Sequence, residues 1–513
     1  MISRKVPFSR RAMLGQAAAS AAWSFFGMQG KAAPARAPFP DKDLHPDGSL
    51  SYTKALPHNA LGAVEQPSFQ QLRKAIETRD PSAFERILIG NVTKLANPQA
   101  AFSRELDGPD PASISIAAPP LFSSDEQAAE AVELYWKALA RDVHFSEYET
   151  SPVIAAACKE LSTFPGFNGP REQGQVTPRN IFRGHTPGDL AGPYISQFLL
   201  ADIQYGVYTI PQRLAPPEAG MDYATTFSRW LAVQNGEARV SDPHEPRVRY
   251  HLDPGSVYLR NGRDLTELVH RDFSYQVFVN AGLSLLSLKA PLDRGNPYRR
   301  SRTQAGFCTF GEAHLMDLVA RVTNCALKAC WYGKWVTYLR LRPEEYGGKV
   351  HLQLTGAVDY PVSRTLKGSE AVQRVYDMYD SYLLPQAYPE GGPTHPAYPA
   401  GHATIAGACA TVLKAFFDES FELRDPVTAS PDGQSLEPCQ APALRVGGEL
   451  NKLASNIAMG RNFAGIHWRT DATAGLEVGE QVAIAILSNV KQTCNEHPCS
   501  FSLTRFDGST IVI

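Results

Sequence analysis

The sequence lacks an excess of either charge. Its 513 residues include 50 Lys and Arg residues and 52 Asp and Glu residues, which gives a formal net charge of −2. A chain with so small a net charge has no general affinity for nucleic acid or for acidic lipid surfaces. We therefore expect no nucleic-acid partner, and a local cluster of Arg and Lys would have to serve a local anion.

Long apolar runs are also lacking. No segment offers the roughly 18 uninterrupted apolar residues that a membrane-spanning helix needs, so we expect no span in the mature chain. The weakly apolar residues 15–28 follow Arg10 and Arg11 and precede small residues at 32–37, which is the pattern of a secretory signal. The arginine pair favours the twin-arginine route and a periplasmic or secreted protein. A disordered basic tail is the alternative.

Cysteine is sparse, and no cysteine belongs to a CxxC pair, which argues against a zinc site. Cys439, Cys494 and Cys499 lie in polar, loop-like sequence and could form a disulfide in an oxidising compartment. The sequence does not define the pairing. Cys409 lies on an apolar helical face and is expected to be a small core residue.

Strand patterns are scarce and limited to short pieces such as residues 350–354. Helical spacing dominates instead, for example at Phe69, Leu72 and Ile76 and in residues 265–288 and 310–341. We predict a mainly α protein made of helical bundles. Its expected parts are a signal peptide at 1–37, an N-terminal helical region at 38–300, a C-terminal helical bundle with an oxyanion site at 301–490, and a tail at 491–513.

Three local expectations refine this outline. Ser124, three residues before Gln127, resembles the start of a helix. Residues 422–442 are polar and rich in Pro and Gly, so we expect a long loop. Asp471 is the expected N-cap of a helix that follows the loop at residue 465.

Three segments carry groups suited to a tetrahedral oxyanion. They are residues 334–343 with Lys334, Arg340 and Arg342, residues 393–402 with His395, Gly401 and His402, and residues 460–467 with Arg461 and His467. Lys and Arg neutralise the charge of such an anion, and Arg can grip two of its oxygens. Gly401 precedes an apolar helical run, so the start of that helix offers free N–H groups. The histidines can act as acid, base, nucleophile or metal ligand.

The order of these segments, K…RP, then PxGH, then Rx5H, resembles the signature that vanadium haloperoxidases share with type-2 phosphatidic acid phosphatases. Residues 131–143 and 182–198 look like the bacterial and red-algal bromoperoxidase branch of that group. The spacing from Lys334 to Arg342 and the additional His395 also resemble this branch. We interpret residues 182–198 as a structural loop ordered by Pro and Gly rather than as part of the metal site.

The resemblance implies a role for each site residue. His467 would be the axial ligand of vanadium, and His402 would be the acid–base group. His395 would lie near the halide or peroxide. The oxygens of vanadate would be bound by Lys334, Arg342, Arg461 and the backbone N–H of Gly401. Arg340 rivals Arg342, but the neighbouring Pro343 favours Arg342. Packing is the expected role of Trp335 and Trp468.

One residue departs from the family pattern. Ala400 stands where the family usually has Ser, whose hydroxyl binds an equatorial oxygen of vanadate. One neutral hydrogen bond is typically worth about 0.5–1.5 kcal/mol. Its loss should weaken or retune the site without abolishing it.

The resemblance implies an enzyme that uses hydrogen peroxide to oxidise a halide, with bromide expected, to hypohalous acid, which then halogenates a small organic acceptor. His402 would take a proton from peroxide, Lys334 would polarise an oxygen of the bound peroxide, and vanadium would act as a Lewis acid. Family analogy also suggests a homo-oligomer.

Two other functions stay open at this point. In an exported acid phosphatase, His467 would form a phosphohistidine and His402 would protonate the leaving group. In a non-catalytic oxyanion-binding protein, His402 would have no obvious purpose. Only Ala400 favours that third interpretation.

Overall fold

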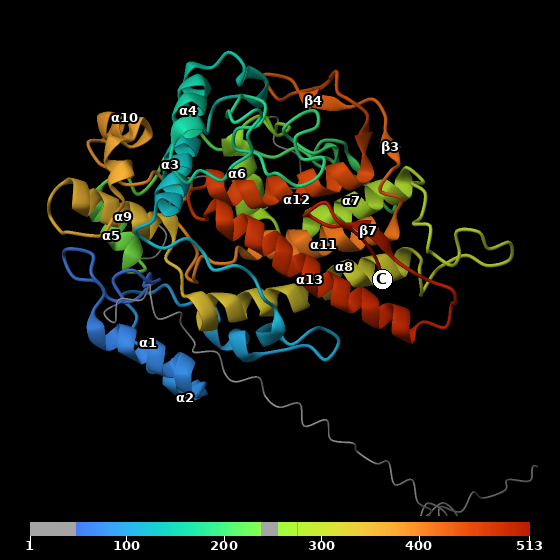
Figure 1. Ribbon diagram of the computed structural model, residues 1–513, viewed down its shortest axis with the longest axis horizontal. Helices are drawn as coiled ribbons and strands as arrows, with labels where there is room; N and C mark the ends of the chain where they lie inside the picture. The colour runs from blue at the N-terminus through green and yellow to red at the C-terminus, as the bar shows by residue number, and fades with distance from the viewer. Residues whose placement is uncertain (1–47, 238–254, 274) are drawn as a thin grey trace, which may run out of the picture. The chain divides into compact units, whose positions relative to one another are not determined.

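Helices dominate the computed structural model (Figure 1), which describes residues 48–237, 255–273 and 275–513. This confirms the expected mainly α fold. The predicted signal segment with Arg10 and Arg11 lies outside the described residues. Within those residues, no helix combines the length and the apolar character that crossing a membrane requires.

Four helices form the centre of the molecule (Figure 1), namely α8 (Glu312–Tyr332), α11 (Gly401–Phe416), α12 (Val446–Phe463) and α13 (Arg469–Thr493). Nearly every residue of α11 is buried, and this helix packs against the other three. Glycine allows α11 and α13 to approach closely. A Cβ atom added at Gly479 would lie 2.1 Å from the carbonyl oxygen of Thr404, and one at Gly407 would lie 2.3 Å from that of Leu476.

The remaining helices come before and between these four. They are α1 (Gln66–Thr78), α2 (Pro81–Phe84), α3 (Asp125–Leu139), α4 (Pro152–Thr163), α5 (Phe227–Gln234), α6 (Gly262–Arg271), α7 (Gln276–Ser287), α9 (Pro343–Leu354) and α10 (Glu370–Tyr379). Helices α3 and α6 pack against α12, and α7 packs against α8 and α11. One hydrophobic core extends from Phe122 to Phe506, so it takes in residues on both sides of position 300. The domain boundary expected there stays a prediction.

Short antiparallel strand pairs occur in the loops between and after the helices of the described residues. The pairs are β1 (Ile203–Tyr205) with β2 (Tyr208–Ile210), β3 (Glu422–Leu423) with β6 (Leu444–Arg445), β4 (Val427–Ala429) with β5 (Leu436–Pro438), and β7 (Ser502–Thr504) with β8 (Thr510–Val512). The expectation of a plain loop at 422–442 was therefore wrong in part. Strands of two or three residues are too short to show an alternating pattern in sequence.

Two further expectations about local structure were wrong. Residues 350–354 belong to α9 and not to a strand. Pro343 starts this helix, and the Glu345 carboxylate accepts a hydrogen bond from the backbone N–H of Arg342 at 2.6 Å, which fixes the first turn. Asp471 lies in the first turn of α13 and is not its N-cap, which is Trp468. An acidic residue is favourable at either position, so sequence alone does not separate them.

Other local expectations were confirmed. The Ser124 hydroxyl caps α3 by accepting a hydrogen bond from the N–H of Gln127 at 3.1 Å. Phe69, Leu72 and Ile76 form the buried face of α1. Cys409 is buried in α11.

Candidate functional site

Lys334 lies in a π-helical turn, η5 (Gly333–Tyr338), that follows α8. The side chain is completely buried, and Nζ donates hydrogen bonds to the carbonyl oxygens of Pro396 at 2.6 Å and Ala397 at 2.8 Å. Burial lowers the pKa of Lys334 to about 7, and the positive charge of Arg342 contributes to the shift. Turns of this kind occur often at functional sites, because the extra residue redirects the side chains of the helix.

Arg342, from the first of the three oxyanion segments, contacts residues of the other two, at 393–402 and 460–467. Its buried guanidinium donates hydrogen bonds to the carbonyl oxygens of His395 at 2.9 Å and Ile466 at 2.8 Å. The same group reaches Nδ1 of His395 at 2.9 Å and Nε2 of His467 at 3.1 Å. A guanidinium can only donate, so both ring nitrogens act as acceptors here. Burial lowers the pKa of Arg342 to about 10.

His467 is oriented by a carboxylate. Its Nδ1 lies 2.7 Å from Oδ2 of Asp471, which also accepts a hydrogen bond from the N–H of Trp468 at 3.0 Å. The proton of the ring therefore lies on Nδ1, and the lone pair of Nε2 points toward Arg342. Burial, followed by the charges of Arg342 and Lys334, holds the pKa of His467 well below its ordinary value. A neutral imidazole fixed in this way is a good metal ligand.

Arg340 and Arg342 have clearly different surroundings. Arg340 forms buried ion pairs with Glu130 and with Oδ1 of Asp471, each at 2.8 Å. It therefore supports the carboxylate that orients His467 and does not face the histidines. Arg342 makes its contacts with the two histidines and with carbonyl oxygens. The role of Arg342 as the anion-binding arginine stays a prediction.

Arg461 lies near the end of α12. One guanidinium nitrogen donates to the carbonyl oxygen of Val269 at 2.6 Å, and the group lies 5.8 Å from the ring centre of Tyr388. Nε of Arg461 is buried without a hydrogen-bond partner among the described residues. Such an atom costs free energy unless a ligand satisfies it.

His402 and Gly401 lie at the start of α11. Nε2 of His402 is 3.1 Å from Oδ1 of Asp272, and about a quarter of the side chain (26%) is exposed. Burial and the charge of Arg461 lower the pKa of His402, whereas Asp272 opposes that shift. Ala400 is the N-cap and offers no side-chain cap, so the first N–H groups of α11 have no side-chain acceptor from that residue. A Cβ at Gly401 would meet only ordinary contacts, the nearest at 3.6 Å.

His395 completes the group. Its ring lies 4.7 Å from the ring centre of Trp331, at an interplanar angle of 41°. Burial, with Lys334 and Arg342 nearby, holds its pKa well below the ordinary value. The two tryptophans expected to pack are fully buried, and Trp468 donates its indole N–H to the carbonyl oxygen of Leu341 at 3.1 Å.

Three buried cations thus surround the neutral histidines. Lys334, Arg342 and Arg461 together contribute to the low pKa of His467. In the described part of the chain, none of the three forms an ion pair with a carboxylate, although buried cations are normally paired. We call Lys334, Arg342, Arg461 and His467 the cradle. A compact oxyanion with several negative charges would balance it and would give Nε of Arg461 an acceptor, so the residues fit vanadate.

Sequence reasoning missed three side chains that contact the histidines of the site. Asp471 follows His467 by four residues, and this spacing could have suggested a carboxylate–histidine pair. Asp272 and Trp331 are separated from their histidine partners by long stretches of chain. Nothing in the local sequence signals those contacts.

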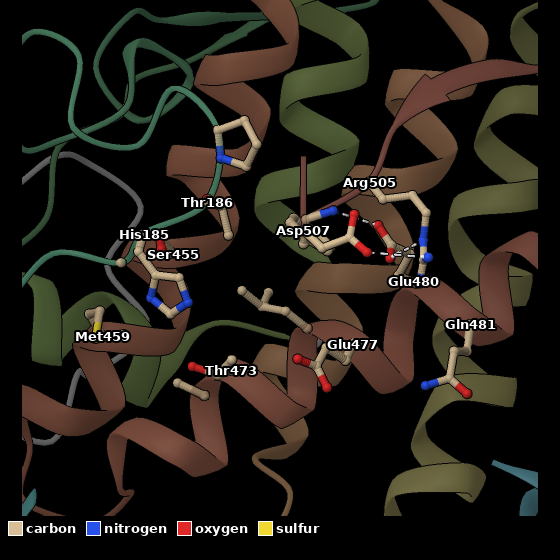
Figure 2. Close-up of a pocket in the computed structure, with 15 residues that line it drawn as sticks. His185, Thr186, Ser455, Met459, Thr473, Glu477, Glu480, Gln481, Arg505 and Asp507 are labelled. Atoms are coloured by element: carbon tan, nitrogen blue, oxygen red, sulfur yellow. Dashed lines mark hydrogen bonds and ion pairs between the residues drawn. The ribbon is translucent and has the colours of Figure 1, made fainter. Parts of the chain in front are cut away.

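Two cavities lie outside the cradle. One of about 360 Å³ lies between residues 184–187, α12, α13 and the C-terminal hairpin, and no cradle residue lines it (Figure 2). Residues 184–187 thus belong to the wall of a separate cavity, and the interpretation of residues 182–198 as a structural loop stays a prediction. The other, of about 290 Å³, is lined by α6, α7 and residues 210–215, and Asp272 is part of its wall.

This fold and this cradle define a helical protein with a site suited to a compact oxyanion. A family model described as the VCPO second helical-bundle domain matches residues 315–496. The vanadium-dependent bromoperoxidase of Corallina officinalis is 34% identical to this chain over 554 residues, which cover 91% of each protein. The vanadium-dependent bromoperoxidase of Ascophyllum nodosum is 35% identical over 491 residues, covering 91% of this chain and 86% of the relative.

A solved structure extends the comparison to the fold. The homohexameric second vanadate-dependent bromoperoxidase of Ascophyllum nodosum matches with a TM-score of 0.83 and 30% identity, over 91% of this chain and 84% of that chain. The chain therefore belongs to the vanadium-dependent haloperoxidase family, together with these algal bromoperoxidases.

Proposed function

We propose that this protein is a vanadate-containing haloperoxidase that uses hydrogen peroxide to oxidise bromide to hypobromous acid. The observation that carries the proposal is the cradle. Three buried cations, which have no carboxylate partner among the described residues, lie around a neutral histidine whose Nε2 lone pair accepts a hydrogen bond from one of them, Arg342. Bound vanadate would supply a Lewis-acid centre that activates peroxide toward the halide.

The residues of the chain would divide the remaining tasks. His467 would bind the metal through Nε2, because Asp471 holds the proton on Nδ1. Lys334, Arg342 and Arg461 would bind and neutralise the oxygens of vanadate. Donors fixed in a buried site need little rearrangement as charge develops, which is why they stabilise a transition state effectively.

His402 is proposed to move the proton. Its pKa lies below the ordinary value, so the ring is neutral near pH 7 and can accept a proton from peroxide. The Asp272 carboxylate at 3.1 Å would stabilise the imidazolium that results. His395 lies against Trp331 and Arg342 and is proposed to line the approach of the halide.

The most direct test combines metal analysis with an assay. The full chain, purified without metal and then supplied with orthovanadate, should bind about one vanadium per chain and brominate an organic acceptor only when peroxide and bromide are both present. Phosphate, which has the same shape, should compete. Activity that ignores vanadate, or that follows haem or iron content, would reject the proposal.

The cavity beside Asp272 is proposed to receive the organic acceptor. Its wall is largely apolar and includes Leu199, Leu259, Leu268 and Val277. Leu268→Trp should fill part of this space and slow bromination of a bulky acceptor more than that of a small one. An unchanged ratio of the two rates would indicate that hypobromous acid leaves before it meets the acceptor.

Export and assembly are two further proposals. Arg10 and Arg11 support twin-arginine export to the periplasm or beyond. Replacing both with Lys should leave precursor in the cytoplasm, and normal export of that variant would contradict the assignment. We also propose a homo-oligomer, supported by the homohexameric algal structure. Light scattering of the purified protein tests it, and a monomer at assay concentration would reject it.

A further inference from the structure

Two cysteines meet where α13 ends. Cys494 is the residue after the last turn of this helix, and its Sγ lies 3.0 Å from Sγ of Cys499. The five-residue separation closes a tight turn that leads into β7. His497, in the same turn, places a ring nitrogen within 4.8 Å of both sulfurs.

The distance between the sulfurs distinguishes two kinds of site. Two thiolates on one tetrahedral zinc ion lie about 3.7 Å apart, because each Zn–S bond is about 2.3 Å long. The observed 3.0 Å is shorter than that and is about 1 Å from the bond length of a disulfide. This group also offers three ligand atoms among the described residues, whereas structural zinc sites use four.

The surrounding contacts hold the turn in place. The Glu496 carboxylate accepts hydrogen bonds from the hydroxyls of Tyr298, at 2.8 Å, and Thr309. The N–H of Ser500 donates to the carbonyl oxygen of Gly295 at 3.1 Å. The two sulfurs are therefore presented to each other by a turn that is fixed on both sides.

The two thiols differ in access. Cys494 is half-buried, whereas Cys499 is buried. Burial, followed by the hydrogen bond with Cys494, raises the pKa of the Cys499 thiol to about 11. An oxidant in solution therefore reaches Cys494 first, and Cys499 is positioned to react second.

We propose that Cys494 and Cys499 form a modification site, which hydrogen peroxide oxidises to a disulfide. The Cys494 sulfur attacks peroxide, the O–O bond breaks, and a sulfenic acid and one water form. The Cys499 sulfur then attacks the sulfenic sulfur, the S–S bond forms, and a second water leaves. In total, two thiols and one peroxide give one disulfide and two waters. This inference rests on the proposed function only in that peroxide is the substrate.

The consequence would be a covalent closure between α13 and the C-terminal hairpin. The first turn of α13 carries Asp471, which orients His467, and the hairpin packs against α11 through β7. The disulfide would hold the far end of the helix that supports the cradle. It would form under the same oxidant that the enzyme consumes.

One tryptic peptide reports on the pair. Residues 492–505 contain both cysteines and no internal Lys or Arg, and residues 425–445 contain Cys439 alone. Vanadate-free full chain is reduced, freed of reductant, and divided into samples with and without peroxide before alkylation. With peroxide, alkylation of the 492–505 peptide should fall about tenfold relative to Cys439, and the peptide should lose about 2 Da.

Variants provide the controls. In Cys494→Ser, Cys499 should stay open to alkylation after peroxide, whereas Cys439→Ser should still form the cross-link. The reduced wild type should unfold at a lower temperature than the oxidised one, and reductant should not change the unfolding temperature of Cys494→Ser. A pair that stays alkylated, that oxidises only to separate sulfinic acids, or that retains one zinc ion would overturn the proposal. Because vanadate is absent, a failure of bromination would not affect this result.

Discussion

His467 and His402 are held by different carboxylates, and this difference supports different chemical roles for them. Asp471 fixes the proton of His467 on Nδ1, which leaves Nε2 unprotonated, so that a metal could replace Arg342 as the partner of its lone pair. Asp272 contacts Nε2 of His402, which is partly exposed at the start of α11. A buried, neutral ring suits a permanent ligand, and a ring at an accessible edge suits proton transfer.

His467→Ala should lose tight vanadate binding, because the only proposed protein bond to the metal is removed. His402→Ala should keep vanadate but brominate about 10²- to 10⁴-fold more slowly, the usual contribution of a general base. Vanadate titration and a bromination assay on both variants test this. Tight vanadate binding by His467→Ala, together with its loss in His402→Ala, would show that the two roles are reversed.

The charge of Lys334 should make vanadate binding depend on pH. With a pKa of about 7 in the metal-free protein, the amine is charged below pH 7 and neutral above it. An anion binds the charged form, so affinity should be constant below pH 7 and should fall by up to about tenfold per pH unit above it. Titrations from about pH 6 to 9 would measure this dependence.

Lys334→Met provides the comparison, because vanadate itself titrates in this range and contributes equally to both proteins. The variant should bind about 10- to 150-fold more weakly at pH 6, the cost of a lost charged hydrogen bond. Its affinity should also fall less steeply above pH 7. Parallel profiles for the two proteins would show that Lys334 stays charged throughout.

Helix α11 begins without a side-chain cap. Ala400 is fully buried at the N-cap and offers no acceptor to the first N–H groups of the helix. Its own N–H donates to the carbonyl oxygen of Asp471 at 2.9 Å, which ties α11 to the first turn of α13. Ala400 therefore contacts the helix that carries Asp471.

Ala400→Ser should reveal which of two roles a hydroxyl takes at this position. If it caps α11, the free energy of unfolding without vanadate should rise by about 0.5–2 kcal/mol. If it binds vanadate, the dissociation constant should fall about 2- to 10-fold. Denaturant unfolding of metal-free protein and vanadate titration separate these outcomes. No change in either quantity would show that the hydroxyl faces neither group.

Some parts of the fold and site could be predicted from the sequence, and others could not. Lys334, Arg342, Arg461 and His467 could be chosen from the sequence because they belong to ordered short motifs that resemble a family signature. Their roles toward vanadate stay predictions. Residues 350–354 were misread, because alternating apolar residues also fit a buried helix once Pro343 starts it. Asp272 and the support of Asp471 by Arg340 depend on long-range packing, which local sequence patterns do not encode.

The cradle is supported by helix α3, which lies far before it in the sequence. Glu130 of α3 accepts hydrogen bonds from Arg340 and from the N–H of Thr470, next to Asp471. Glu133, one turn further along α3, pairs with Arg469. A chain of buried charges thus runs from α3 through Arg340 and Asp471 to His467. The C-terminal bundle alone would lack this support.

The three buried cations of the cradle should make the metal-free protein less stable than the vanadate-bound protein. Lys334, Arg342 and Arg461 are buried close together without a carboxylate partner among the described residues, and the charges of Arg342 and Arg461 contribute to lowering the pKa of Lys334. An anion that binds only the folded protein at about 100 times its dissociation constant stabilises it by about 2.7 kcal/mol. In a chain of this size, that gain should raise the unfolding temperature by about 3 °C.

Differential scanning calorimetry with orthovanadate should therefore show this rise, and excess phosphate should reduce it by competition. Arg461→Met should lose most of the shift, because the cradle loses one cation and the buried Nε that lacks a partner. Arg505→Met is the matched control, since Arg505 pairs with Glu480 in the cavity between α12, α13 and the C-terminal hairpin, which no cradle residue lines (Figure 2). It should start from a lower unfolding temperature but keep the full vanadate shift. An equal shift in both variants would mean that the anion binds elsewhere.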